Sequence, residues 1–533
     1  MTRVRDLAAT ALLLVLTLVL HRKVVRLWWT WDDFYLLHQI LDFRWTAAFY
    51  DSAVWPQKLF TPLVLAMYEA NLSLWGLDPA RWFVVHLAFT IGATLAFYAA
   101  LRLWFTPLGA GAGAALFVAS VPLVSLTTEL SGIHYISAIL LGSIATIAYV
   151  VSLRRARIAL AIVSAFVLLV GMLFKETIIP LPFLLIALPE RDFRARFRHA
   201  IPHAVALAIY FAWRYAVIGT LLGGYGWAID RDDWLPLIAS LPEKIVLACA
   251  GVHVPLGVTL IVLMLLVMIR KGGALLFLLG MLLAVGPILP VSKEMQRRYA
   301  LMPWLCWSVA FVAGAEALRR KYPRAGATVM IAIPLLMVVT QRQEWRYEYG
   351  RALRMSDEGR FFLDMPPDSY FRLPTIPPAA LGELNWLKTA HLGKPGGAAW
   401  FYDDYFLCST DVTGKRAWQF LPERRAMVEI TSELPAIGRR HCASIRHDAP
   451  LNAAFDYRDS ALFWTFGPYD RGQYRVLLGN GVQAFDVPRT DGFRLPDMPG
   501  ITLRVRYIAP DGWTTYSPDL AIDFRKGRMA WRR

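Results

Sequence analysis

The stretch LAATALLLVLTLVL (Leu7–Leu20), followed after a basic flank by Trp31-Asp32-Asp33, decides how this chain folds. Its first part is a predominantly apolar segment of the kind that enters a lipid bilayer. Its second part adds two adjacent carboxylates, and the next long apolar run begins only near Trp82. Because acids beside a bilayer are costly and usually functional, we predict that loop 30–80 forms the heart of an active site at one membrane face.

Composition sets the class of protein. Of the 533 residues 56% are hydrophobic, the mean hydropathy is +0.42, and repeated apolar runs alternate with short clusters of Arg and Lys. This pattern indicates an integral membrane protein and excludes a soluble one. Much of the net charge of +16 falls in short loops, where it sets topology and contacts membrane lipids, so we expect no nucleic-acid partner.

The apolar runs predict about eleven membrane-spanning helices. They lie near residues 6–21, 81–104, 108–124, 133–153, 158–173, 177–189, 200–218, 243–269, 273–290, 298–318 and 325–340. Basic clusters at 3–5, 154–157, 191–198, 270–271 and 319–324 then fall on one side, which the positive-inside rule makes cytoplasmic. No small-residue cleavage site follows Leu20, so the first span is expected to be an uncleaved anchor. We expect a multi-pass protein of the cell inner membrane, with its amino terminus in the cytoplasm and its carboxyl terminus outside.

The sequence predicts two domains. Residues 1–340 form a transmembrane domain with the external loop 30–80, and residues 341–533 form a β-rich extracytoplasmic domain. In that domain, 474–478 and 482–487 flank Asn480-Gly481 as a hairpin, and residues 501–507 alternate in polarity before a turn at Asp511-Gly512. The expected architecture is a small sandwich, with a helical or irregular lead-in over 345–400.

Cysteine positions add one further expectation. Cys249 and Cys306 fall inside predicted spans, whereas Cys408 and Cys442 lie in the external domain. An oxidising compartment permits a disulfide there, so we predict that Cys408 and Cys442 pair.

Within the loop, residues 34–43 and 59–75 mix apolar and polar residues at a helical rhythm, which predicts two amphipathic helices along the membrane surface. An Asp immediately before the first of these helices is also a good N-cap. Capping is therefore the alternative to a chemical role for either Asp32 or Asp33.

Several short segments, taken in order, resemble a known family. They are the early Asp32-Asp33, Leu59-Phe60-Thr61-Pro62-Leu63, Leu74-Trp75-Gly76-Leu77-Asp78-Pro79 leading into a helix with His86, Phe174-Lys175-Glu176-Thr177, and Arg297-Arg298-Tyr299 with Met302-Pro303. Over about the first 340 residues, this order resembles the GT-C superfamily of membrane glycosyltransferases. The carboxyl-terminal part resembles no family that we can name.

The resemblance implies a transferase that moves a sugar from a polyprenyl-phosphate donor to an envelope acceptor on the external face. The residues are compatible with it, because no phosphate-cradling glycine-rich loop for a nucleotide sugar precedes a helix. By analogy with a one-step displacement, we expect inversion at the anomeric carbon. The acceptor stays open between lipid, glycan and protein.

Such a reaction needs a base near the acceptor and cations near the leaving phosphate. Asp32 or Asp33 is the candidate base, with the other acid orienting the acceptor or the helix start. Three cations are candidates for the donor phosphate: Lys175, Arg297 and Arg298. Glu176, Tyr299 and His134 are the supporting residues.

Each assignment has a simpler alternative. Lys175 and Glu176 could be a local ion pair at a helix break, and the two arginines could contact lipid headgroups. A solitary His134 is more often hydrogen-bonded than catalytic. No cofactor is required, although a divalent metal between Asp33 and one of the acid pairs 232–233 or 403–404 stays open; both pairs are expected to be solvated.

Three other functions compete with this interpretation. A lipid-linked saccharide flippase or transporter would carry polar groups inside several helices, whereas the acids here cluster in loops. An oligosaccharide polymerase or ligase would use the same lipid carriers. A non-catalytic scaffold presenting the β-rich domain would tolerate substitution of Asp32 and Asp33.

Overall fold

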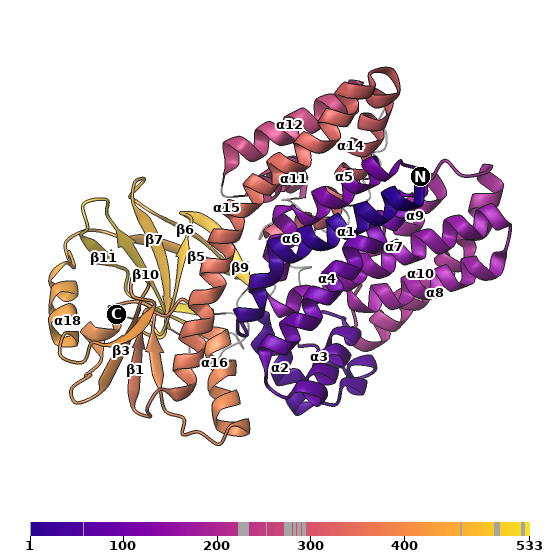
Figure 1. Cartoon of the computed structure of the whole chain (residues 1–533). Coiled ribbons are helices and arrows are strands. Elements are labelled where there is room, and N and C mark those ends of the chain that lie inside the picture. The colour runs from indigo at the N-terminus through magenta and orange to yellow at the C-terminus, as the bar shows by residue number, and fades with distance from the viewer. Residues whose placement is uncertain are drawn as a thin grey trace. The chain divides into compact units, whose positions relative to one another are not determined.

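The computed structural model describes residues 2–56, 58–221, 234–251, 253–270, 280, 284, 289, 295–458, 461–494, 502–523 and 528–532. The chain divides into two compact units, Met1–Leu353 and Arg354–Arg533. The division falls inside one long helix, α15 (Pro323–Asp364). Figure 1 colours the first unit from indigo to pink and the second from orange to yellow.

The first unit is helical. Besides the first part of α15, its α-helices are α1 (Thr2–His21), α2 (Asp32–Asp42), α3 (Pro62–Trp75), α4 (Pro79–Leu101), α5 (Pro107–Val118), α6 (Val121–Thr127), α7 (Ile133–Arg155), α8 (Ile158–Phe174), α9 (Leu181–Ala187), α10 (Phe193–Ile218), α11 (Trp234–Ala250), α12 (Val254–Arg270) and α14 (Leu301–Lys321). Short 3-10 turns join them: η1 (Arg22–Arg26), η2 (Trp45–Phe49), η3 (Ser52–Val54), η4 (Leu130–Gly132), η5 (Glu176–Ile178) and η8 (Arg297–Ala300).

Six helices in the described part of the chain are long and apolar enough to cross a membrane, and up to eight spans result if each of two bent pairs counts as one. They support a multi-pass membrane protein, but the expected count of eleven spans is not confirmed. The bent pairs correspond to the predicted spans 108–124 and 243–269: α5 meets α6 at 54°, and α11 meets α12 at 111°. Pro122 in the first turn of α6 and Gly251 after α11, with a φ of 74°, mark the two breaks.

Two causes account for the remaining differences between the predicted and the observed spans: some helices are short, and one predicted span lies almost entirely outside the described residues. Helix α8 has 17 residues and α9 has 7, fewer than the roughly 20 that a straight crossing needs. The predicted span 273–290 lies almost entirely outside the described residues.

The loop 30–80 contains the two helices that the sequence predicts. Helix α2 buries Phe34, Leu37 and Ile40 on one face, as an amphipathic pattern requires. Helix α3 begins at Pro62 rather than at Leu59, since proline suits the first turn of a helix.

The second unit contains β-strands and short helices. Its strands are β1 (Ser369–Arg372), β2 (Ala399–Phe401), β3 (Arg416–Leu421), β4 (Ala426–Glu429), β5 (Asn452–Arg458), β6 (Ala461–Gly467), β7 (Gln473–Leu478), β8 (Gln483–Val487), β9 (Thr490–Arg494), β10 (Thr502–Ile508), β11 (Thr514–Tyr516), β12 (Asp519–Asp523) and β13 (Arg528–Arg532). Its helices are α16 (Pro378–Trp386), the π-turn η9 (Leu387–His391), α17 (Phe406–Ser409) and α18 (Leu434–Ala443).

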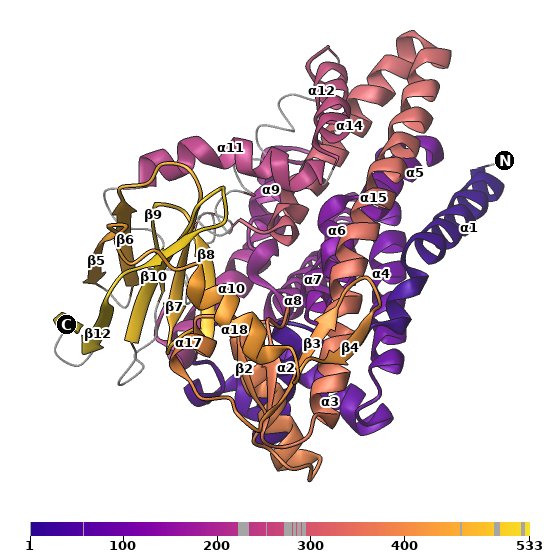
Figure 2. The ribbon, with the colours of Figure 1, turned by 90° about the vertical axis from the view of Figure 1, so that its left-hand side faces the viewer.

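The later strands form the predicted sandwich. An antiparallel sheet in the order β13-β12-β10-β7-β8, with β11 beside β10, packs on the three-stranded sheet β5-β6-β9. Alternate residues of β6, β7 and β10 fill the core between them, including Trp464, Val476 and Val505. The hairpin β7–β8 and the strand β10 before the turn at Gly512 confirm the expectations for these segments; Figure 2 shows β7, β8 and β10 together.

The lead-in differs from the expectation. Residues 345–400 are not simply helical or irregular, because they contain β1 and the start of β2. Both strands join a mixed sheet in the order β2-β1-β3-β4, in which β1 runs parallel to β2 and β3. Parallel pairing needs connections that cross over the sheet, so no local hairpin pattern in the sequence reveals it.

Candidate functional site

A cavity of about 260 Å³ in the first unit collects most of the predicted site residues. We call it the polar cavity. Its lining includes Asp32, His134, Lys175, Glu176, Arg298 and Tyr299 from the predicted set, together with Trp31, Tyr35, Leu36, Trp55, Leu59, Thr61, Val64, Ser131, Tyr135, Thr177 and Gln296. Two predicted residues, Asp33 and Arg297, do not line it.

The ends of helices supply these side chains. Asp32 opens α2, His134 lies in the first turn of α7, and Lys175 follows the last residue of α8. Arg298 and Tyr299 belong to η8, directly before α14. The cavity therefore lies at one end of the helix bundle, where segments more than 260 residues apart in sequence meet.

The two adjacent carboxylates have opposite surroundings. The Asp32 side chain is 54% exposed, lines the polar cavity, and has its Oδ2 3.3 Å from Nη1 of Arg298. The Asp33 side chain is fully buried. Neither acid is the N-cap of α2, because that position belongs to Trp31, which makes no side-chain cap.

The Asp33 carboxylate accepts hydrogen bonds from three different segments of the chain. The backbone N–H groups of Thr30 and Ser131 donate to it at 2.9 and 2.7 Å, and the Tyr68 hydroxyl donates at 3.0 Å. Burial raises the pKa of Asp33 to about 7, although these three donors oppose the shift. Its position supports a structural role in holding Asp32 at the cavity.

Arg298 belongs to a chain of alternating charges. Its Nη1 lies 3.3 Å from Asp32 and 3.0 Å from Glu129. Arg351 contacts Glu129 at 3.4 Å and Glu348 at 2.8 Å. Glu348 in turn binds Arg297 at 2.9 Å. Burial raises the pKa of Glu129, while the two neighbouring arginines oppose this shift.

Arg297 faces a second cavity instead of the first. This cavity, of about 320 Å³, is lined by Trp31, Ser125, Glu129, Met295, Gln296, Arg297, Arg298, Tyr347, Glu348 and Arg351. We call it the arginine cavity. Trp31, Gln296 and Arg298 line both cavities.

Glu176, which also lines the polar cavity, lies between two cations. Nζ of Lys175 is 3.1 Å from its carboxylate, and Nη1 of Arg214 is 4.0 Å away. Arg214 comes from α10, is almost fully buried, and also donates to the Tyr210 hydroxyl at 3.0 Å. Because Arg214 shares the neutralisation of Glu176, Lys175 keeps positive character toward the cavity, where it also lies 5.2 Å from the Tyr135 ring centroid.

His134 and Tyr299 complete the predicted set. The His134 ring packs on Tyr135, with 4.6 Å between centroids. The Arg298 guanidinium lies 5.6 Å from the Tyr299 ring centroid. Both aromatic contacts fix the walls of the cavity beside its charged groups.

An apolar cavity of about 190 Å³ lies in the same unit and is lined by other residues than the polar one. Ile178 and Leu181 line it directly after Thr177 of the polar cavity, and Met302 lines it one helical turn after Tyr299. Leu305 and Cys306 of α14 continue the same wall. Because two segments of the chain line first one cavity and then the other, the two cavities suit an amphiphilic ligand with a charged head and a hydrocarbon chain.

Within the described residues, no group of three or more His, Cys, Asp or Glu side chains could hold a metal ion. Asp232 and Asp233 lie outside the described residues. Asp403, expected to be solvated, is instead fully buried.

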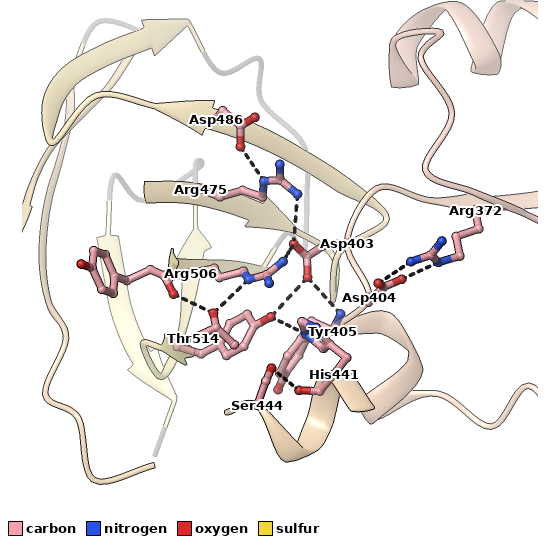
Figure 3. Close-up of polar contacts among 12 residues, drawn as sticks. Arg372, Asp403, Asp404, Tyr405, His441, Ser444, Arg475, Asp486, Arg506 and Thr514 are labelled. Atoms are coloured by element: carbon pink, nitrogen blue, oxygen red, sulfur yellow. Dashed lines mark hydrogen bonds and ion pairs between the residues drawn. The ribbon is translucent and has the colours of Figure 1, made fainter. Parts of the chain in front are cut away.

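The surroundings of Asp403 explain its burial. As Figure 3 shows, Asp403 accepts from Arg506 at 2.7 Å and from Arg475 at 3.4 Å, while Asp404 pairs with Arg372. Two guanidinium groups compensate the charge of the buried Asp403 carboxylate, so removal of either arginine would leave part of that buried charge uncompensated.

Comparison with known proteins does not assign this chain to a family. No protein-family model matches the chain, and no curated protein matches it at a significant level.

Sequence reasoning missed several partners of the site. Arg214 is the single Arg or Lys within the predicted span 200–218, and an ionisable residue inside an apolar span is itself a functional signal. Glu348 and Arg351 follow the predicted span 325–340 on one helical face. Glu129 gave no local signal, because its partners lie 169 and 222 residues further along the chain.

Proposed function

We propose that this protein is a membrane glycosyltransferase of the GT-C type, which moves a sugar from a polyprenyl-phosphate donor to an envelope acceptor on the extracytoplasmic face. The observation that carries the proposal is the polar cavity, which is lined by a carboxylate, Asp32, and two cations, Lys175 and Arg298. The residues that follow in two of its segments line an apolar cavity.

Each feature has a role in the proposed reaction. The apolar cavity receives the first part of the prenyl chain, and Lys175 and Arg298 bind the phosphate and stabilise the charge that develops on its leaving oxygen. Asp32 removes the proton from the acceptor hydroxyl as that oxygen bonds to the anomeric carbon. The products are the glycosylated acceptor, with inverted configuration, and the free polyprenyl phosphate.

Membrane orientation supports an external site. If α1 starts in the cytoplasm, the helix ends that carry Asp32, Lys175 and Arg298 fall on the external side. The arginine-rich turns at 154–157, 191–198 and 319–324 then fall on the cytoplasmic side, in agreement with the positive-inside rule. The proposed location is the inner membrane, with the second unit outside the cytoplasm.

The transporter alternative receives less support from this geometry. A transporter binds its cargo near the middle of the membrane between broken helices. The polar cavity instead lies at helix ends. A polymerase or ligase would use the same cavity, and its product would differ in the size of the transferred group.

The test is transfer in liposomes that contain the full-length protein, a panel of radiolabelled polyprenyl-phosphate sugars, and cell-envelope extract as acceptor. Asp32→Asn is expected to lower transfer at least about 10²-fold at unchanged folded yield, because it removes the base. Asp42→Asn is the matched control, since it makes the same change on the same helix at an exposed side chain outside the cavity.

The variant Asp33→Asn tests whether the Asp33 carboxylate takes part in the reaction or only stabilises the fold. It is expected to lower the yield of folded protein more than the activity of each folded molecule, because its carboxylate contacts only groups that hold the loop in place. Undiminished transfer by Asp32→Asn would refute the assignment of the base. Absence of transfer from every donor in the wild type would refute the transferase.

A further inference from the structure

Apart from Arg298, the residues that line the arginine cavity have no role in donor binding as proposed above. Its chemistry nevertheless resembles that of a binding site: two aromatic rings, Trp31 and Tyr347, alternate with arginines and glutamates around about 320 Å³. We propose that this cavity is an acceptor subsite that binds a saccharide. The inference rests on the proposed glycosyl transfer and names the class of acceptor.

Its position suits an acceptor. Arg298 lines both cavities and contacts a carboxylate in each direction, Asp32 toward the polar cavity and Glu129 toward the arginine cavity. Trp31, which precedes the candidate base, also lines both. A hydroxyl of a ligand in the arginine cavity therefore approaches the donor pocket at the point where base and cation meet.

Its charge favours a neutral, hydroxyl-rich ligand over an anion. Arg297 and Arg351, which line this cavity and not the polar one, are each paired with a glutamate, in contacts between 2.8 and 3.4 Å. A phosphate or carboxylate would have to displace a glutamate from these pairs. A saccharide needs no displacement, because its hydroxyls can donate to carboxylates and accept from guanidinium groups that are already fixed.

The aromatic rings are also held in place. The Arg351 guanidinium lies 5.3 Å from the Trp31 ring centroid, and the Arg297 guanidinium lies 5.3 Å from that of Tyr347. Trp31 has a φ of 44°, a conformation that non-glycine residues rarely adopt. Rigid aromatic faces beside fixed polar groups suit the apolar face and the hydroxyl edge of a sugar ring, whereas an extended peptide would need unpaired backbone partners.

A binding experiment tests the subsite without requiring turnover. Saturation-transfer NMR on the full-length protein in nanodiscs uses methyl glycosides of glucose, galactose, mannose and N-acetylglucosamine as probes. We expect ring-proton signals from at least one glycoside in the wild type and roughly tenfold weaker binding in Tyr347→Ala. Arg346→Ala, which changes an exposed side chain of the same helix outside both cavities, is the matched control and should bind as the wild type does.

A transfer experiment then separates this inference from the proposed function. Octyl glycosides, octanol and a Ser/Thr-containing peptide serve as acceptor probes with radiolabelled polyprenyl-phosphate sugars. Label in octyl glycosides, with the acceptor KM raised about tenfold in Tyr347→Ala and the donor KM changed less, is the expected result.

The remaining outcomes are distinct. Label in octanol or the peptide alone would overturn the saccharide subsite and leave the transferase standing. Glycoside binding that depends on Tyr347, without transfer from any donor, would support the subsite and reject the transferase. Equal glycoside binding by the wild type and Tyr347→Ala, or binding by neither, would mean that the charged chain is only a structural network.

Discussion

At the scale of single residues, burial distinguishes two carboxylates that are adjacent in the sequence. Asp32 is open to the polar cavity and contacts Arg298, whereas Asp33 is enclosed by three donors. The sequence could place both acids at the site, since they follow an apolar segment, but it could not distinguish them. The distinction depends on Tyr68 and Ser131, which approach only when the chain is folded.

The pKa of Asp33 predicts how stability changes with pH. Its folded value, about 7, lies above the unfolded value near 3.8, so the unfolded chain releases this proton first as the pH rises. The contribution to stability is therefore fully present below about pH 4 and is lost as the pH rises toward 7, with each pKa unit worth about 1.4 kcal/mol. Thermal unfolding in detergent between pH 4 and 8 should show a falling melting temperature for the wild type and a flatter profile for Asp33→Asn.

Arg298 allows a sharper test of the phosphate site. Its Nη1 contacts both Asp32 and Glu129, so the planar guanidinium can hold these carboxylates through one nitrogen and offer its other N–H groups to a phosphate, which a single ammonium group cannot do. We expect Arg298→Ala to lower kcat for transfer about 10²-fold or more, and Arg298→Lys to recover only part of that loss. Arg346→Ala provides the control for loss of one positive charge, and full activity of Arg298→Lys would show that only charge matters.

At the scale of elements, the sequence predicts most site segments because each follows or precedes an apolar run. Lys175 follows α8 and Arg298 precedes α14, and simple alternation of spans puts both at the same end. The sequence could not predict how the spans are built, because a hydropathy pattern does not register the bends between α5 and α6 or between α11 and α12. It also could not identify Glu129 or Arg351 as partners of the site, since no spacing relates them.

One close contact between elements positions Lys175 and Glu176. At Gly171 in α8, an added Cβ would lie 2.6 Å from the Ile178 side chain and 3.2 Å from Cβ of Leu141 in α7. The glycine thus lets η5 fold back against α8, and the Lys175 N–H donates to its carbonyl at 3.0 Å.

Gly171→Ala is therefore expected to reduce stability by about 1–3 kcal/mol through overpacking, and to lower transfer by displacing Glu176. The melting temperature and the transfer rate should fall together. Gly111→Ala in α5 is the matched control, because its added Cβ would meet nothing within 4 Å, and alanine is the better helix former. An unchanged melting temperature in Gly171→Ala would show that Ile178 can move aside at little cost.

At the scale of the whole molecule, the chain consists of two units with different kinds of core. Leu116, Trp304 and Phe311 belong to a core shared by helices of the first unit, whereas the second unit has a β-sandwich core around Trp464 and Val505. The change in sequence character near residue 341 predicts this division only approximately. Helix α15 continues through it, and buried apolar residues still recur at helical spacing after its apolar part ends, at Ala352, Met355 and Phe362.

The second unit carries the disulfide that the sequence predicts. Cys408 of α17 and Cys442 of α18 are joined with a Cα–Cα distance of 5.9 Å across a separation of 34 residues. The bond holds α17, and with it the preceding Asp403, against α18, which carries His441. Closing a loop of this length is worth about 4 kcal/mol, largely by restricting the unfolded chain.

Replacement of both cysteines by serine should therefore destabilise the second unit and leave the first unaffected. Limited proteolysis of the full-length protein in nanodiscs should show faster cleavage within residues 400–450 and an unchanged pattern within the helical unit. The double replacement Cys249→Ser and Cys306→Ser is the control for cysteine content, since both are free thiols of the first unit. A disulfide persists only in an oxidising compartment. If the second unit is external, the wild type isolated from cells under alkylating conditions should therefore retain the bond. Two alkylated thiols at Cys408 and Cys442 would instead place this unit in the cytoplasm, and would invert the proposed topology and the membrane face to which the polar cavity opens.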